Sequence, residues 1–283
     1  MLSIGWRWGR RSCCPATVIP VPFTTSSTAS ASGPSPGITR KKARNSGGYG
    51  SPRPGPTPSR IPAAAVAAAE SLTVEDRRER LVRRVSAEMT RIGHPLSPPV
   101  EASLRSVPRH LFLPEGLWPA AYDNAAQLIG WGQTISQPLI VALMTELLRP
   151  RRGDAVLEIG SGSGYQAAIL SGLVERVYGV ETIPALAAKA AERLARLGYG
   201  NVRIRQGDGR DGWPEHAPFD GIIVAAAAVE LPPGLAPQLR TGGRLVIPLG
   251  GHRLSQDLFV FEKRADGTLD GTSVLPVAFV PLV

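Results

Sequence analysis

The chain has very little cysteine and no long hydrophobic run. Only two of its 283 residues are cysteine, adjacent at Cys13 and Cys14. Everything that follows them therefore lacks a disulfide, a thiolate nucleophile and a cysteine metal ligand, which suits a reducing compartment. No run approaches the roughly 20 apolar residues of a membrane-spanning helix. We therefore expect no membrane partner.

Acidic residues are absent before Glu70, whereas nine of the 32 Lys and Arg residues lie there. The other 23 basic residues equal the 23 acidic ones, so the chain from Glu70 onward is formally neutral. The net charge of +9 belongs to the leader alone. A neutral globular part offers no broad cationic field for nucleic acid, and no nucleic-acid partner is expected.

The leader, residues 1–69, is rich in Ser, Pro, Gly and Arg and has no apolar periodicity. Such a segment cannot bury enough surface to offset the entropy of ordering, so we expect it to be disordered. Three interpretations stay open: an unstructured extension or upstream sequence included by a misplaced start codon, an organelle transit peptide, and an anion-binding arm. A secretory signal is less favoured, because Pro15, Pro20 and Pro22 interrupt the candidate apolar run.

Residues 70–283 have the pattern of one α/β domain. An amphipathic helix is expected from about residue 71 to 93, a short helix over 98–106 and an apolar helix over 138–148. Strands are then expected at 155–159, 176–180, 202–206, 219–224 and 243–248, with helices at 165–173, 184–197 and 232–239. This alternation predicts a doubly wound, mostly parallel sheet with helices on both faces. The last forty residues predict an antiparallel hairpin that turns at Asp266 and Gly267.

The segment 107–137 has little periodicity. A loop of this length inside a compact domain is usually either functional or misassigned, and we favour a functional one.

The stretch DAVLEIGSGSGYQ, residues 154–166, is a strand that ends in a glycine turn and leads into a helix. Gly160, Gly162 and Gly164 alternate, whereas the dinucleotide fingerprint has its third glycine three positions after the second. Glu158 would repel a pyrophosphate but suits a cationic or amino-bearing ligand. The turn therefore favours S-adenosylmethionine over NAD.

Later acidic residues support this ligand. Glu181 ends the second strand, where a carboxylate can accept both ribose hydroxyls, and Asp208 with Gly209 ends the third, near an adenine amino group. We also place Asp220 and the small residues of FDGIIVAAAA at the end of the fourth strand, beside the sulfonium. The four histidines show no metal-ligand spacing, so no metal site is expected.

Six segments, in this order, resemble the protein-L-isoaspartate O-methyltransferases: YDNAAQLIGWGQTISQP, VLEIGSGSGYQAAIL, GDGRDGW, APFDGIIVAAAA, LRTGGRLVIPLG and FVPLV. The resemblance covers about residues 71–283. It implies a class I S-adenosylmethionine-dependent methyltransferase fold and methylation of the free α-carboxylate of L-isoaspartyl residues in damaged proteins, after which succinimide formation can restore a normal aspartyl link. We therefore expect a monomeric, cytoplasmic protein-repair enzyme.

The resemblance also implies roles for individual residues. Ser136 matches the family's active-site serine, although as the cap of the helix that follows it has a compatible structural role. Leu139 departs from relatives that often carry His or Tyr there. The cofactor-binding positions by motif are Gln133, Thr134, Ile135, Glu158, Gly160, Ser161, Gly162, Glu181, Asp208 and Gly209. The substrate-binding positions are Phe279, Val280 and Pro281.

Two alternatives to protein repair remain. The chain is then either a methyltransferase for another acceptor, such as a small acid or RNA, or a non-catalytic cofactor-binding protein that interacts through its basic leader. A steep salt dependence of binding would indicate RNA. Cofactor binding without turnover would indicate the interaction protein.

Overall fold

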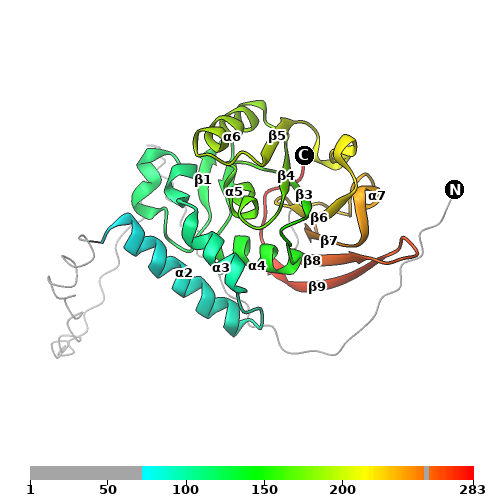
Figure 1. The fold of residues 1–283 in the computed structure, drawn as a ribbon, viewed down its shortest axis with the longest axis horizontal. Coiled ribbons are helices and arrows are strands. Elements are labelled where there is room, and N and C mark those ends of the chain that lie inside the picture. Colours follow the sequence, from blue (N-terminus) through cyan, green and yellow to red (C-terminus); the bar gives the residue numbers. More distant parts are fainter. Residues whose placement is uncertain (1–71, 252–254) are drawn as a thin grey trace, which may run out of the picture. The chain divides into compact units, whose positions relative to one another are not determined.

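The computed structural model describes residues 72–251 and 255–283 (Figure 1). The expected disorder of residues 1–69, the interpretations of the leader and His252 lie outside these residues. Within them, no helix combines the length and the apolar character needed to cross a membrane.

A seven-stranded sheet organises the described part (Figure 1). Its strands stand in the order β5-β4-β3-β6-β7-β8-β9, and all pairs from β5 to β7 are parallel, whereas β7, β8 and β9 pair antiparallel. The strands are β3 (Ala155–Ile159), β4 (Arg176–Glu181), β5 (Val202–Gln206), β6 (Phe219–Val224), β7 (Leu239–Leu249), β8 (Gln256–Lys263) and β9 (Leu269–Val277). The sheet order reverses at β3, so its carboxyl end faces the crevice where such sheets bind ligands. The expected doubly wound sheet and C-terminal hairpin are confirmed.

Helices cover the two faces of the sheet unequally. Five of them pack over one face: α2 (Val74–Arg91), α3 (Pro98–Ser106), α4 (Pro138–Leu148), α5 (Tyr165–Ser171) and α6 (Pro184–Arg196). They bury Val156, Val177 and Ile223 of the central strands. The opposite face, with Leu157 and Ile222, packs against the short α7 (Leu235–Gln238) and Trp213.

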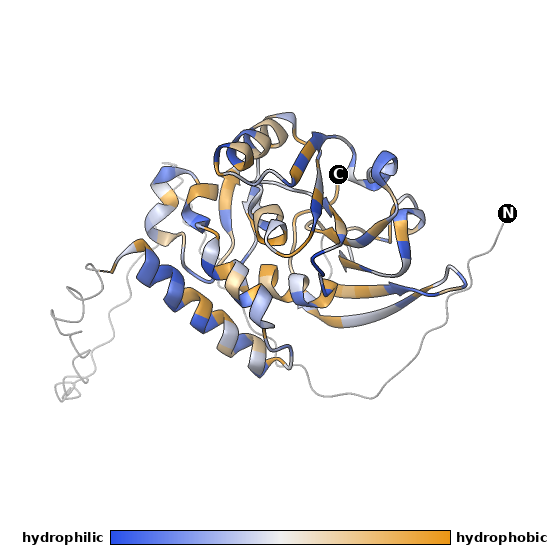
Figure 2. Cartoon of the chain, viewed as in Figure 1, coloured by the Kyte–Doolittle hydropathy of each residue, from blue (hydrophilic) through white to orange (hydrophobic). Residues whose placement is uncertain are grey.

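The amphipathic first helix is confirmed, and it is a few residues shorter than expected at both ends. The Thr73 hydroxyl accepts a hydrogen bond from the Asp76 amide, and the Asp76 carboxylate accepts one from the Thr73 amide, both at 3.1 Å. A capping box therefore begins α2. Along α2, Figure 2 shows hydrophilic and hydrophobic residues alternating, because one side is buried against the core and the other carries the arginines.

The segment 107–137 is more ordered than expected. It contains two 3-10 helices, η1 (Arg109–Phe112) and η2 (Glu115–Ala120), and a separate antiparallel hairpin of β1 (Gln127–Gly130) and β2 (Gln133–Ile135). Gly130, Trp131 and Gly132 make the hairpin turn, with φ angles of 96°, 51° and 72°. Glycine adopts this left-handed region without strain, which explains why two of the three are glycine.

Candidate active site

The glycine turn after β3 is the centre of the site. Gly160, Gly162 and Gly164 have φ angles of 79°, 52° and 86°, in the region that a Cβ disfavours. The Gly160 amide donates to the Val180 carbonyl at 2.8 Å, which ties the start of the turn to β4. The turn then leads into α5, and its first residues line the pockets described below.

Glu181, at the end of β4, holds this turn from the other side. One carboxylate oxygen accepts the Gly162 amide at 2.8 Å and the other accepts the Ile183 amide at 3.0 Å. Only 5% of Glu181 is exposed, so these charge-assisted hydrogen bonds are shielded from water. Glu181 therefore shapes the turn as well as lining the pocket described next.

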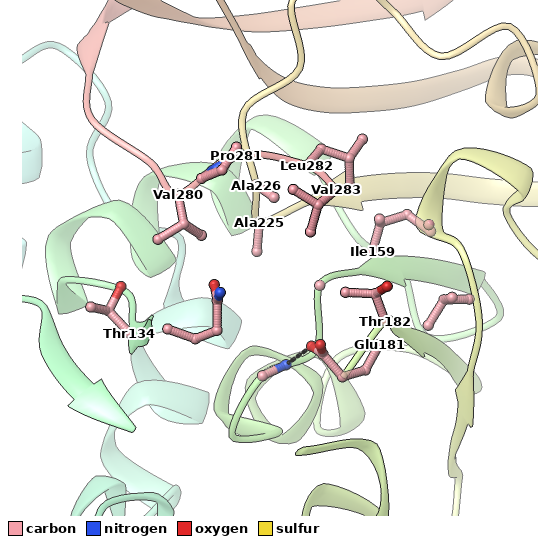
Figure 3. A pocket seen from close by; sticks show the side chains of 15 residues that line it. Thr134, Ile159, Glu181, Thr182, Ala225, Ala226, Val280, Pro281, Leu282 and Val283 are labelled. Atoms are coloured by element: carbon pink, nitrogen blue, oxygen red, sulfur yellow. Dashed lines mark hydrogen bonds between the residues drawn. The ribbon is translucent and has the colours of Figure 1, made fainter. Parts of the chain in front are cut away.

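A pocket opens at the carboxyl ends of the parallel strands (Figure 3). Figure 3 shows Thr134 of the β1–β2 hairpin on one side, Glu181 with Thr182 below, and the C-terminal segment across the top. The lining residues are Gln133, Thr134, Ile159, Gly160, Gly162, Val180, Glu181, Thr182, Gly209, Ala225, Ala226, Val280, Pro281, Leu282 and Val283. Five separate stretches of sequence thus meet the glycine turn here.

A second pocket adjoins the first along the glycine turn. The two share four residues: Thr134, Gly160, Gly162 and Ala225. The second is further lined by Ile135, Ser136, Val141, Glu158, Ser161, Ser163, Tyr165 and Gln166. The structure therefore brings the expected active-site serine, Ser136, and the buried acid of β3, Glu158, into one cavity beside the glycine turn.

Glu158 is a buried carboxyl without a hydrogen-bond partner. It is completely buried, and neither of its oxygens nor the Ser161 hydroxyl finds a partner within the described residues. Burial raises the pKa of Glu158 to about 7; the nearby Ser161 hydroxyl lowers this pKa and the charge of Glu181 raises it. Buried polar groups of this kind are normally satisfied, so an unpaired carboxyl beside the glycine turn fits a ligand that brings its own cation or donor. The residues present thus fit an amino-bearing sulfonium cofactor.

The C-terminal segment is fixed beside the loop that follows β6. The Ala227 amide donates to the Val280 carbonyl and the Leu282 amide to the Ala227 carbonyl, both at 2.8 Å. The buried Gln256 side chain accepts the Phe279 amide at 2.7 Å and donates to the Phe279 carbonyl at 3.2 Å. Val280 and Pro281 consequently line the first pocket. Phe279 lines neither pocket and instead packs against the core.

Most of the expected cofactor positions line one pocket or the other, and Asp208 does not. Its carboxylate forms an ion pair with the Arg210 guanidinium at 2.6 Å and accepts the Arg210 amide at 2.8 Å. These hydrogen bonds hold the pKa of Asp208 below its usual range. Its neighbour Gly209 lies in the first pocket, where a Cβ would overlap Cγ2 of Ile159.

Two expectations were wrong. Asp220 does not lie near a sulfonium site, because it stands at the start of β6, where it accepts the Ala155 amide at 2.8 Å and pairs with Arg240. The residues at the carboxyl end of that strand that do line the pocket are Ala225 and Ala226.

Ser136 does not cap α4 either. Gln137 occupies the cap position and makes no side-chain cap. A first-turn amide, that of Leu139, donates instead to the Asn124 side chain at 3.0 Å.

A parallel sheet of this order, with an acid ahead of a glycine turn and a second acid at the next strand end, defines a class I S-adenosylmethionine-dependent methyltransferase. Residues 80–283 match the family model described as protein-L-isoaspartate(D-aspartate) O-methyltransferase. The chain belongs to this family.

Individual relatives agree with the family model. Protein-L-isoaspartate O-methyltransferase 2 of Syntrophobacter fumaroxidans is 51% identical over 210 residues, which cover 72% of this chain and 85% of that protein. Protein-L-isoaspartate O-methyltransferase 1 of Cupriavidus necator is 48% identical over 228 residues, or 79% and 87% of the two chains.

Solved structures show the same fold. One protein-L-isoaspartate O-methyltransferase aligns with a TM-score of 0.63 and 30% identity, over 72% of this chain and 65% of that chain. A second, a putative protein-L-isoaspartate O-methyltransferase of Plasmodium falciparum in complex with S-adenosyl-L-homocysteine, has a TM-score of 0.61 and 25% identity, over 73% and 98% of the chains.

Proposed function

We propose that the two adjoining pockets hold S-adenosylmethionine along the glycine turn and admit the α-carboxylate of an isoaspartyl residue at Ser136. As a member of its family, the protein is an S-adenosylmethionine-dependent methyltransferase that acts on isoaspartyl residues in protein repair. The observation that supports this placement is that Ser136 and Glu158 line one cavity that shares the glycine turn with the other.

The cofactor roles follow from the groups that the pockets offer. Glu181 accepts the ribose hydroxyls, Gly160 and Gly162 let the ligand approach the backbone, and Glu158 accepts the amino group. Gln133, Thr134 and Ile135 cover the ligand from the β1–β2 hairpin, and Ser161 and Gly209 complete its surroundings. Asp208 reaches the adenine amino group after its carboxylate leaves Arg210. The bound cofactor supplies an electrophilic methyl group.

The reaction requires little acid or base catalysis by the protein. A carboxylate with a pKa of about 4 is already ionised at neutral pH and needs no general base. The chain must instead hold one carboxylate oxygen in line with the methyl group and keep water away. The Ser136 hydroxyl forms no hydrogen bond within the described residues, so it is free to donate to the substrate carboxylate.

The acceptor reaches this point between the hairpin and the C-terminal segment. Val280 and Pro281 form the wall opposite Thr134 (Figure 3), and we place the isoaspartyl peptide along them. Phe279 contributes to this wall through its backbone, which Gln256 fixes, because its side chain packs against the core.

We also propose the organisation of the whole chain. Residues 70–283 form the methyltransferase domain, and residues 1–69 form a leader outside it. The protein acts as a cytoplasmic monomer without a nucleic-acid partner. The formal neutrality from Glu70 onward supports the last point. A mass twice that of the monomer, measured by light scattering of the purified full chain, would contradict the proposed monomeric state.

The activity test uses a synthetic peptide with one isoaspartate and its normal aspartyl twin. Methyl transfer to the first alone is expected, and equal rates on both would reject the proposed acceptor site. Ser136→Ala should lower kcat/KM by about 10- to 100-fold, the value of one hydrogen bond to a charged group, with little change in the Kd of S-adenosylhomocysteine. Ser106→Ala, at the end of α3 and outside both pockets, is the matched control. A folded Ser136→Ala enzyme with full activity would remove Ser136 from the mechanism.

A further inference from the structure

Arg109, in η1, is a completely buried arginine that binds backbone carbonyl groups. Its Nε donates to the Ala121 carbonyl at 3.0 Å. Its Nη2 donates to the Ala125 carbonyl at 3.3 Å and to the Ser136 carbonyl at 2.9 Å. One side chain therefore joins the end of η2, the approach to the β1–β2 hairpin and the residue that follows β2.

The Arg109 charge has no counterion in the described part of the chain. No carboxylate there lies within ion-pair distance of the guanidinium, and its Nη1 has no hydrogen-bond partner. The guanidinium also lies over the Tyr165 ring, whose centroid is 4.9 Å from Cζ. Burying an unpaired cation is costly, so a fold that keeps one gains little stability from it. A role in geometry explains its presence better than a role in stability.

Both groups that Arg109 holds on the pocket side belong to the second pocket. Ser136 and Tyr165 line it together with Glu158, whereas Arg109 does not line it. Ser136 follows β2 directly and precedes α4, and no helix or strand ladder fixes its carbonyl. Because the carbonyl and the side chain share one Cα, a donor that fixes the carbonyl also limits where the hydroxyl points.

We propose that Arg109 is a positioning residue for methyl transfer, which holds the Ser136 backbone so that the Ser136 hydroxyl meets the substrate carboxylate. This inference rests on the proposed role of Ser136. Arg109 acts through Ser136 and touches neither ligand. A planar fork is required, because a lysine ammonium cannot reach carbonyls on opposite sides in fixed directions.

Arg109→Lys is the direct test, since it keeps the charge and removes the fork. We expect kcat on the isoaspartyl peptide to fall about 10- to 100-fold, as for a reacting group displaced by about 1 Å. The Kd of S-adenosylhomocysteine, measured by calorimetry, should change less than about threefold, because Glu181 and the glycine turn are untouched. The calorimetric stoichiometry counts the folded sites, and kcat is expressed per site, so partial unfolding cannot imitate the effect.

A double-mutant cycle with Ser136→Ala separates positioning from mere structure. If Arg109 acts through Ser136, Arg109→Lys lowers kcat less than about threefold further in the Ser136→Ala background. An effect of equal size in both backgrounds would overturn the inference while leaving the proposed function intact. Full activity of Ser136→Ala alone would instead overturn the proposed function, and this inference with it.

The matched control is Arg244→Lys. Arg244 also donates to a carbonyl, that of Leu147, at 3.1 Å. It lies in β7, next to the first residues of β6 in the sheet and away from the pocket. Its kcat should stay within about twofold of the wild type. If Arg109→Lys does not fold, Arg109→Gln, a neutral donor that buries no charge, takes its place in the same cycle. Wild-type kcat in a folded Arg109→Gln enzyme would overturn the inference.

Discussion

The buried Glu158 makes stability depend on pH in a direction opposite to that of most carboxylates. Burial raises its pKa from 4.5 to about 7 in the folded protein. Between these two values the folded state keeps a proton that the unfolded state has released. Stability therefore falls as the pH rises through this interval, and the full penalty applies above pH 7. Below pH 4.5 both states are protonated and the penalty disappears.

The size of this penalty follows from the shift. A difference of about 2.5 pKa units corresponds to about 3 kcal/mol of unfolding free energy at 1.36 kcal/mol per unit. Glu158→Gln replaces the carboxyl with a neutral amide of nearly the same shape. The difference in unfolding free energy between the variant and the wild type should therefore be up to about 3 kcal/mol more favourable to the variant at pH 8 than at pH 4.5. An unpaired amide in the variant costs the same free energy at every pH, so it adds a constant to the stability difference and does not change its dependence on pH.

Urea unfolding of both proteins from pH 4.5 to 8, without cofactor, measures this difference, provided that the m-value stays constant. The contributions of all other titrating groups cancel between the two proteins. Glu192→Gln changes a glutamate whose side chain is 75% exposed, and its pH profile should parallel the wild type. If the stability difference between Glu158→Gln and the wild type is independent of pH, the assigned burial of a protonated Glu158 is wrong.

Two further predictions concern the ligand, and a third concerns packing beneath the first pocket. Cofactor binding at pH 6 should release a proton from the wild type, because a bound cation favours the ionised form of Glu158. Binding to Glu158→Gln should release none. Calorimetry in buffers of different ionisation enthalpy counts the released protons. Glu181→Gln should raise the Kd of S-adenosylhomocysteine about 10- to 100-fold through lost charge-assisted hydrogen bonds, and an unchanged Kd would contradict its role. Gly209→Ala should lower the unfolding free energy by about 1–3 kcal/mol, measured in urea, since its Cβ overlaps Ile159; wild-type stability would mean that the β3 side chain moves freely aside.

The sequence predicted the centre of the sheet well because strands β3, β4 and β6 are buried on both sides. A strand such as β3 is apolar throughout apart from Glu158, and the glycines that follow mark its end without ambiguity. Pro184 marks the start of α6 in the same way, at its first position. These signals are local, so no knowledge of the tertiary structure is needed to read them.

The residues that the sequence missed depend on contacts between distant segments. The β1–β2 hairpin has strands of only four and three residues, too short to show a period of two. Asn124 caps α4 from fifteen residues away, which displaced the expected cap at Ser136. Asp220 was expected at the carboxyl end of β6, whereas it lies at the start of that strand. The motif FDGIIVAAAA alone does not show how the strand is aligned with its neighbours in the sheet. For Arg109 the sequence offers no signal, since burial of an arginine is decided only by packing.

The residues that local sequence signals predicted and those that depend on distant contacts also have different roles in the site. The glycine turn and Glu181 lie at strand ends, which the class of methyltransferases shares, and we propose that they hold the common ligand. The proposed acceptor route runs between the hairpin and the C-terminal segment, both of which line the first pocket and neither of which belongs to the parallel sheet (Figure 3). Both are fixed by buried polar side chains that bind backbone groups, Arg109 for the first and Gln256 for the second. Because such side chains set backbone position without contacting a ligand, choice of acceptor can change through them while the cofactor pocket stays the same.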